Sequence, residues 1–282
     1  MPAHVAVITD STACLPEHLA AQWGVAVVQV QLQVGATMDD EHRIGRQDLI
    51  DAMKAGTPVT TAPPDTGAFF WAFQEAASSG ASSVVSIHLS GRMSATVQAA
   101  REAAQQVRIP VHVLDSQTTG MSLGFAAISA ARAAGAGAQA RRVIDAAEQR
   151  FRTSTEFIYV DTLEYLRRGG RIGGAQAWIG TKFAIKPVLT VRGGEVAPLA
   201  RVPGARRAIS KMTDLAIAAA GSQPVDIAVT RFGSDERFAE LSADLVKRIP
   251  NVHESHLVEA SAIIGAHVGP GALGITVSPV GG

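Results

Sequence analysis

Hydroxyl and imidazole side chains stand out in this sequence because they lie in stretches rich in Gly, Pro and apolar residues. His267 is the one ionisable side chain in the stretch Ile263–Leu273, which also holds three glycines. Glycine lets a ligand approach the main chain closely. An imidazole beside hydroxyls can hydrogen-bond a carboxylate or a phosphate without a buried, uncompensated Lys or Arg. A tight turn with an incidental histidine is the alternative. The polar residues of this candidate set are Thr60, Thr61, Ser90 and His267.

The first half of the chain alternates short β-branched runs with helical patterns, which predicts a parallel sheet with helical crossovers. Residues 25–34 are expected to form one strand. The expected strands end in small polar residues, at Asp10-Ser11, Ser90-Gly91 and Asp115-Ser116. Ligands of open α/β sheets lie beyond the carboxyl ends of the strands. Helix capping is the alternative role for such residues. We favour a binding site, with Thr60-Thr61 as a further contributor.

The pattern changes near Thr153. A strand is expected at 156–160, a helix at 176–183, a hairpin at 185–202 and a closing strand at 274–280. We therefore expect an α/β protein of two domains. Residues 1–155 would form a parallel-sheet α/β domain that carries Thr60, Thr61 and Ser90. Residues 156–282 would form an α+β domain with a mixed or antiparallel sheet, which carries His267.

Composition narrows the class of ligand. Hydrophobic residues make up 47% of the 282 residues and aromatics only 5%, so a cavity would have aliphatic walls that suit an alkyl chain. Lys plus Arg and Asp plus Glu both total 25, which argues against a nucleic-acid binder. The single cysteine, Cys14, fits a reducing, cytoplasmic setting. No uncharged apolar run reaches the length of a transmembrane helix, about 18 residues.

Motifs of several enzyme classes fail on their spacing. Gly180-Thr181-Lys182 reverses the order of a P-loop, and His253-Glu254-Ser255-His256 lacks the spacing of a zinc-protease helix. Ser90 lacks the glycine two residues earlier that marks a nucleophile elbow. We therefore expect no metal, no cofactor and no nucleotide site in this chain. Arg171 and Arg201 lie in a Gly-rich segment and in the hairpin, where an isolated arginine most often serves solubility.

The sequence resembles those of the DegV family, the fatty-acid-binding subunits of bacterial fatty acid kinases. The resemblance covers essentially the whole chain. It rests on Thr9-Asp10-Ser11, Thr60-Thr61-Ala62-Pro63-Pro64, Leu89-Ser90-Gly91, Asp115-Ser116, Leu163-Glu164-Tyr165-Leu166-Arg167-Arg168-Gly169-Gly170-Arg171-Ile172 and Gly265-Ala266-His267-Val268-Gly269-Pro270-Gly271.

The resemblance implies one long-chain fatty acid in an apolar tunnel. Residues 1–155 would carry the head-group loops, and residues 156–282 would contribute the lipid cavity and the His267 loop. Its carboxylate would accept hydrogen bonds from Thr61, with Thr60 as a second candidate, and from Ser90 and His267, with Gly91 beside them. A separate ATP-dependent kinase would convert the carboxylate to an acyl phosphate, helped by the basic residues Arg171 and Arg201. The chain would then be a carrier, not an enzyme.

Two points stay open at this stage. Family members often read Ser-Gly-Thr-Tyr where this chain has Ser90-Gly91-Arg92-Met93, so Arg92 adds a positive charge that either pairs with the head group or points outward. The rival function is a stand-alone hydrolase or phosphotransferase with Ser90 as nucleophile and His267 as base. Asp10 or Asp115 would orient the imidazole in that case.

Overall fold

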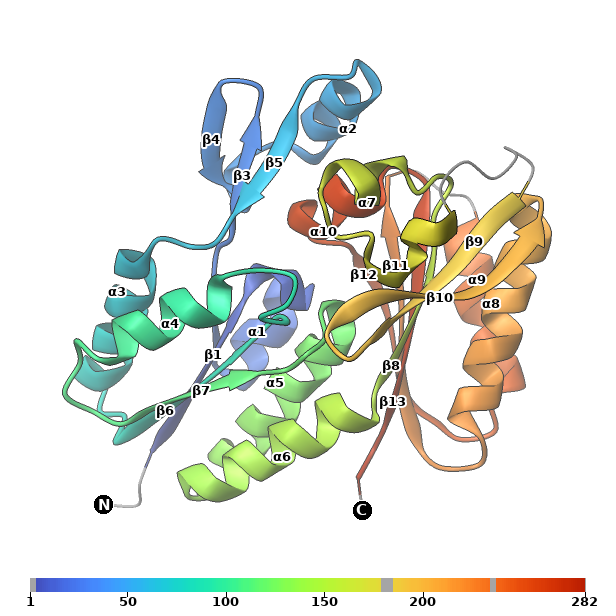
Figure 1. Cartoon of the computed structure of the whole chain (residues 1–282). Coiled ribbons are helices and arrows are strands. Elements are labelled where there is room, and N and C mark those ends of the chain that lie inside the picture. Colours follow the sequence, from blue (N-terminus) through green and yellow to red (C-terminus); the bar gives the residue numbers. More distant parts are fainter. Residues whose placement is uncertain (1–3, 179–184, 234–236, 282) are drawn as a thin grey trace.

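Three sheets organise the chain in its computed structural model, which describes residues 4–178, 185–233 and 237–281. Figure 1 shows the first sheet on the left, the second on the right, and a small third sheet standing above them. Both chain ends lie at the bottom of the same view. None of the helices within the described ranges combines the length and apolar character that a membrane crossing requires.

The first sheet is parallel throughout, as the alternation of strands and helices predicts. Its central strand β6 is buried along its whole length because helices cover both faces. The strands, in sheet order, are β2 (Val25–Val28), β1 (Val5–Asp10), β6 (Ser83–His88) and β7 (Val111–Asp115). The helices of this half are α1 (Glu17–Trp23), α3 (Thr66–Ser78), α4 (Thr96–Ala104), α5 (Gly120–Gly135) and α6 (Ala140–Thr153).

The second sheet is mixed, which confirms the expected fold class. Only β11 and β12 run parallel, and the remaining pairs are antiparallel. In sheet order the strands are β10 (Glu195–Pro203), β9 (Ile185–Arg192), β8 (Thr155–Tyr159), β13 (Ala272–Pro279), β11 (Val225–Phe232) and β12 (Val252–Glu259). The helices of this half are α7 (Glu164–Arg168), α8 (Ala205–Ala220), α9 (Arg237–Arg248) and α10 (Ala262–Val268). The proposed domain boundary at residue 155 stays a prediction, although this sheet begins there.

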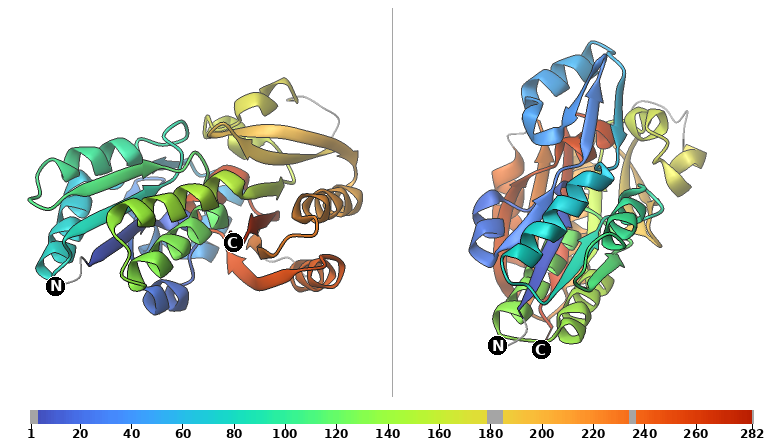
Figure 2. Two further views of the ribbon diagram at one scale, coloured as in Figure 1. Left: turned by 90° about the horizontal axis from the view of Figure 1, so that it is seen from below. Right: turned by 90° about the vertical axis from the view of Figure 1, so that its left-hand side faces the viewer.

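Helices α5 and α6 lie between the two large sheets, whereas α8 and α9 cover the far face of the second sheet (Figures 1 and 2). Helix α5 is buried from Gly120 through Ile128 and again at Ala130 and Ala131. A helix that is enclosed on all sides needs apolar residues all round. The alanine-rich sequence of this segment therefore serves close packing between two sheets.

The third sheet was not predicted. The apolar run 25–34 was expected to be one strand, but it divides between two sheets. β2 ends at Val28, and the chain then leaves the first sheet to form β3 (Gln31–Val34), which pairs with β4 (Thr37–Asp40) and β5 (Val59–Ala62). Helix α2 (Arg46–Lys54) accompanies this sheet. Alternation of apolar side chains gives the strand period but not the partner strand, which explains the error.

The expected helix 176–183 is also corrected in its described part. Residues Gly173–Trp178 form a 3-10 helix, and residues 179–183 lie outside the described residues. Short 3-10 helices at Ser11–Ala13 and Glu41–Arg43 follow β1 and β4. The hairpin expected at 185–202 is confirmed by β9 and β10.

Candidate functional site

A cavity of about 190 Å³ lies between the two halves of the molecule. The carboxyl ends of β1 and β6 contribute Thr12 and Leu89, and the second half contributes Leu166, Val191 and helix α10. We call this space the main cavity. Its wall is largely aliphatic, as the composition predicts. The polar residues that line it are Thr12, Thr61, Ser94, Thr119, Arg171 and His267.

Thr61 and His267 meet at this cavity. Thr61 Oγ1 lies 3.0 Å from His267 Nε2. Thr60, the neighbouring candidate, is exposed and its hydroxyl donates to Gln33 Oε1 over 3.2 Å. Successive side chains of a strand point to opposite faces, so β5 can turn only one of its two threonines toward α10. Thr61 is the residue that faces the cavity.

His267 stands in the last turn of α10, not on a loop, which corrects that expectation. Ser261 caps this helix, because its Oγ accepts from the backbone N–H groups of Ile263 and Ile264. Ser261 before an apolar run was a helix-start signal that the sequence reasoning missed. The helix is held further by Glu41, whose Oε2 accepts from Ile263 N over 3.2 Å.

The imidazole of His267 is neutral at neutral pH. Burial, followed by the nearby Arg171 guanidinium, lowers its pKa to about 4. Its Nδ1 is buried and has no hydrogen-bond partner among the described residues. Gly169 packs directly on the ring, because a Cβ at that position would overlap Nδ1. The imidazole of His267 can therefore occupy this position only because residue 169 has no side chain.

Arg171 lines the main cavity beside His267. Its Nε donates to Met93 O over 3.0 Å, and its Nη1 donates to Gly169 O over 2.6 Å. These bonds use two of the five N–H donors of a guanidinium. Arg201 does not line the cavity; it is exposed, with its guanidinium 4.7 Å from the centre of the Trp178 ring.

Ser90 and Gly91 do not line the main cavity, so their assignment to the head group stays a prediction. Ser90 Oγ donates to Gly194 O over 2.7 Å, and Gly91 N donates to Asp115 Oδ1 over 3.1 Å. Arg92 points outward, because its guanidinium forms an exposed ion pair with Glu195 at 2.9 Å. Ser94, which the sequence reasoning did not select, lines the cavity instead.

The rival enzyme lacks its catalytic geometry in the described residues. Thr61, not Ser90, is bonded to His267. The two candidate acids are engaged elsewhere: Asp115 accepts from Gly91 N, and Asp10 bonds His88. The same part of the chain holds no group of three or more His, Cys, Asp or Glu that could bind a metal ion.

Asp10 organises the strand ends around the cavity. Its Oδ2 accepts from Leu89 N and lies 3.0 Å from His88 Nδ1, while its Oδ1 accepts from Thr12 N. His88 Nε2 in turn lies 2.7 Å from Ser86 Oγ. The side chains of Asp10, His88 and Ser86 are fully buried and bonded to one another, so this acid, imidazole and hydroxyl form a structural network. It fixes Thr12 and Leu89 in the cavity wall.

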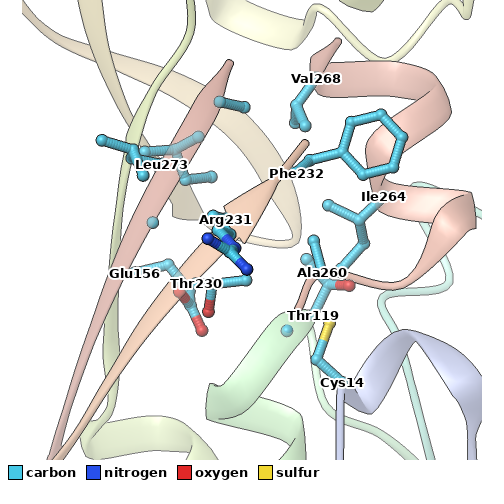
Figure 3. Close-up of a pocket in the computed structure, with 14 residues that line it drawn as sticks. Cys14, Thr119, Glu156, Thr230, Arg231, Phe232, Ala260, Ile264, Val268 and Leu273 are labelled. Carbon is cyan, nitrogen blue, oxygen red and sulfur yellow. The ribbon is translucent and has the colours of Figure 1, made fainter. Parts of the chain in front are cut away.

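A smaller cavity of about 50 Å³ adjoins the main one. The two share Thr119, Ile158, Ile264 and Val268, so these four residues lie where the cavities adjoin. Figure 3 shows this inner cavity, with Phe232, Ile264, Val268 and Leu273 toward one end and Cys14, Thr119, Glu156 and Thr230 toward the other. Burial raises the pKa of Glu156 to about 7. His267 thus lines the main cavity, and the adjoining inner cavity ends among polar groups.

Comparison with known proteins agrees with this architecture. The model of the family described as "Uncharacterised protein, DegV family" matches residues 4–280. A DegV domain-containing protein of Streptomyces coelicolor is 41% identical over 279 residues, with 99% of each chain covered. Protein DegV of Bacillus subtilis is 31% identical and covers 96% of this chain and 98% of its own length.

Two solved structures extend the comparison to the fold. A DegV family protein from Thermus thermophilus, described by its fatty acid binding, is 31% identical, has a TM-score of 0.92, and matches 98% of this chain and 100% of its own. DegV of Bacillus subtilis, described as a fatty acid binding protein, is 29% identical with a TM-score of 0.89, and matches 99% and 100%. With sequence and fold matched from end to end, this chain belongs to the DegV family.

Proposed function

We propose that this protein binds a long-chain fatty acid, with the carboxylate at Thr61 and His267 and the acyl chain in the main cavity. The observation that carries the proposal is the aliphatic cavity with one hydrogen-bonding pair at its edge. The fatty acid binding of the Thermus thermophilus and Bacillus subtilis relatives supports the same class of ligand.

The Thr61–His267 pair has one proton to offer a carboxylate. A neutral imidazole carries one N–H and a threonine carries one O–H. Their mutual bond uses one of these two protons in either tautomer. If Nε2 accepts, the Nδ1–H remains; if Nε2–H donates, the Thr61 hydroxyl proton remains. In either arrangement the pair therefore keeps one hydrogen-bond donor for an anion.

Arg171 supplies the charge that balances the carboxylate. Its guanidinium lines the cavity and lies close enough to His267 to lower the histidine pKa. A buried carboxylate without a compensating cation is costly. With His267 neutral, Arg171 is the cation for the head group. His267 would therefore orient the carboxylate by a hydrogen bond, and Arg171 would attract it by its charge.

The acyl chain contributes most of the binding free energy. Burial of each CH₂ group yields on the order of 0.8 kcal/mol. Aliphatic residues such as Val30, Leu89 and Val196 form the wall, so the cavity offers the tail few polar groups. The head-group contacts then set orientation and the choice of acid over other lipids.

Calorimetry with a matched pair of ligands tests the proposal. A saturated long-chain fatty acid and the alcohol of equal chain length bury the same tail but differ in the charged head. We expect the acid to bind at least tenfold more tightly, because a hydrogen bond to a charged group contributes about 1.5–3 kcal/mol. Equal affinity for the two ligands would refute the head-group assignment, and no binding of either would refute the function.

We further propose that the bound carboxylate is presented to an ATP-dependent kinase for conversion to an acyl phosphate. Arg201 is suited to that partner because it is exposed and stacks on Trp178 outside the cavity. Arg201→Ala should keep fatty-acid affinity and lower acyl-phosphate formation, trapped with hydroxylamine, in the presence of the kinase and ATP. Arg141→Ala, an exposed arginine of α6, is the control. Unchanged acyl-phosphate formation in the Arg201 variant would contradict this role.

A further inference from the structure

Two buried polar atoms of the main-cavity lining have no hydrogen-bond partner within the described residues. One is His267 Nδ1, at the proposed head-group end. The other is Thr119 Oγ1, which belongs to a residue shared by the main and inner cavities. A buried polar group without a partner is costly, and nearly all such groups in proteins are paired. The proposed carboxylate would lie at His267, so it does not provide a partner for Thr119 Oγ1.

The local structure explains why the Thr119 hydroxyl is unpaired. Thr119 is the N-cap residue of α5, where a threonine normally accepts from a backbone N–H of the first turn. Here Glu156 Oε1 accepts from Ser122 N over 2.8 Å and takes that role. Thr119 itself makes no side-chain cap bond. The carboxylate has replaced the hydroxyl as the cap.

Gly120 makes this replacement possible. A Cβ at residue 120 would lie 3.2 Å from Glu156 Oε1, and its φ of +63° is a conformation that favours glycine. Glu156 is further fixed by Thr276 Oγ1, which lies 2.9 Å from both carboxylate oxygens. The helix start is thus complete without Thr119, whose oxygen is left between the two cavities.

Cys14 and Glu156, at the same end of the inner cavity, both have hydrogen-bond partners. Cys14 Sγ accepts from Ser261 N over 3.2 Å and donates to Thr12 O over 3.6 Å. Glu156 is bonded to Ser122 and Thr276 as described. Figure 3 shows Thr119 beside Cys14 at the polar end of the inner cavity. A ligand that passes from the main to the inner cavity therefore meets a hydroxyl that can both donate and accept.

We propose that the site selects a fatty acid with a hydroxyl group partway along its acyl chain, hydrogen-bonded by Thr119. The proposal rests on the proposed function, because it assumes that the tail runs from the main into the inner cavity. A plain alkyl chain leaves Thr119 Oγ1 unpaired. A secondary alcohol pairs it and satisfies its own hydroxyl in the same bond. Sites built to bond a hydroxyl discriminate against the analogue that lacks it.

Competition binding with saturated acids of one chain length tests the proposal. The set contains the plain acid, acids hydroxylated at successive positions in the middle of the chain, and one hydroxylated beside the carboxylate. For the wild-type protein we expect a mid-chain hydroxy acid to bind about tenfold more tightly than the plain acid, the effect of one net hydrogen bond. The acid hydroxylated beside the carboxylate should show no such gain.

Thr119→Val supplies the matched variant, because valine keeps the shape and removes the hydroxyl. It should lose the tenfold preference for the mid-chain hydroxy acid over the plain acid, because it can no longer bond the hydroxyl. Thr37→Val, an exposed threonine of β4, should keep the preference. A wild-type protein that binds plain and hydroxylated acids equally would overturn the proposal and leave fatty-acid binding intact. A preference that persists in Thr119→Val would also overturn it. Failure to bind any acid would refute the proposed function together with this inference.

Discussion

Thr61 Oγ1 and His267 Nε2 lie 3.0 Å apart although 206 positions separate the two residues in the sequence. Thr61 comes from the small third sheet, and His267 comes from the last helix of the chain. Their contact joins the two halves of the molecule at the edge of the main cavity. We regard this pair as the polar end of the fatty-acid site.

Removal of either partner should weaken fatty-acid binding. Thr61→Val keeps the shape and deletes the hydroxyl, and His267→Gln removes the imidazole that is bonded to Thr61. We expect about 10- to 100-fold weaker binding of a fatty acid in each variant, since one hydrogen bond to a charged group is lost. The alcohol of equal chain length should lose less affinity, because its hydroxyl makes only a neutral hydrogen bond to the pair. Calorimetry with both ligands gives the comparison, and equal losses for acid and alcohol would point to a damaged cavity instead.

Gly169 should be as sensitive as His267 itself. A Cβ at residue 169 would overlap His267 Nδ1, so Gly169→Ala must displace the imidazole from Thr61. We expect a loss of fatty-acid affinity similar to that of His267→Gln. Gly135→Ala is the matched control, because no atom lies within 4 Å of a Cβ built at that helix end. Tight fatty-acid binding by Gly169→Ala would show that the position of His267 does not control the ligand.

The buried His267 should make stability depend on pH. Its pKa falls from the ordinary 6.5 to about 4 in the folded chain. Between these values the unfolded chain binds a proton that the native chain does not, so acid favours unfolding. The free energy of unfolding of the wild type should drop by about 3 kcal/mol relative to His267→Gln as the pH falls from 6.5 to 4.

This difference between variant and wild type isolates the histidine. Glu156, whose pKa is raised to about 7, contributes the opposite slope because the native chain holds its proton up to a higher pH. That contribution is common to both proteins and cancels. Urea titrations at several pH values measure the difference. Parallel pH curves for wild type and His267→Gln would mean that the native histidine titrates normally.

Asp10 should matter for stability more than any surface carboxylate. It is fully buried and bonded to Thr12, His88 and Leu89. Asp10→Asn replaces an acceptor oxygen by a donor, which leaves buried groups unpaired and should cost about 2–4 kcal/mol of unfolding free energy. Asp145→Asn, which removes an exposed ion pair with Arg141, should cost less than about 1 kcal/mol. Similar denaturation midpoints for both variants would contradict the structural role of the Asp10 network.

The sequence predicted the strands better than it predicted which strands pair with one another in a sheet. Alternation of strands and helices gave the parallel first sheet, and the change after residue 153 gave a second, mixed sheet. The third sheet was missed because the apolar alternation continues from β2 into β3 without a break. Strand period is a local property, whereas the choice of sheet depends on contacts with distant segments.

The candidate site also combines residues that the sequence predicted with residues whose roles depend on contacts between distant segments. Thr61 and His267 were selected by residue type and come together in the fold. Thr60 lies on the opposite face of its strand, and Ser90 bonds a carbonyl of the distant β9–β10 turn. The unpaired Thr119 hydroxyl could not be foreseen, because it depends on Glu156 of β8 accepting a hydrogen bond from Ser122 of α5. Localisation in the cytoplasm also stays a prediction.

Mass spectrometry of the freshly purified protein tests the central claim most directly. Under native conditions we expect the mass of one chain plus one fatty acid, and under denaturing conditions the mass of the chain alone together with the released acid. The released mass also gives the chain length and reveals any hydroxyl group. A protein that is empty as purified, and that takes up no added fatty acid, would contradict the account.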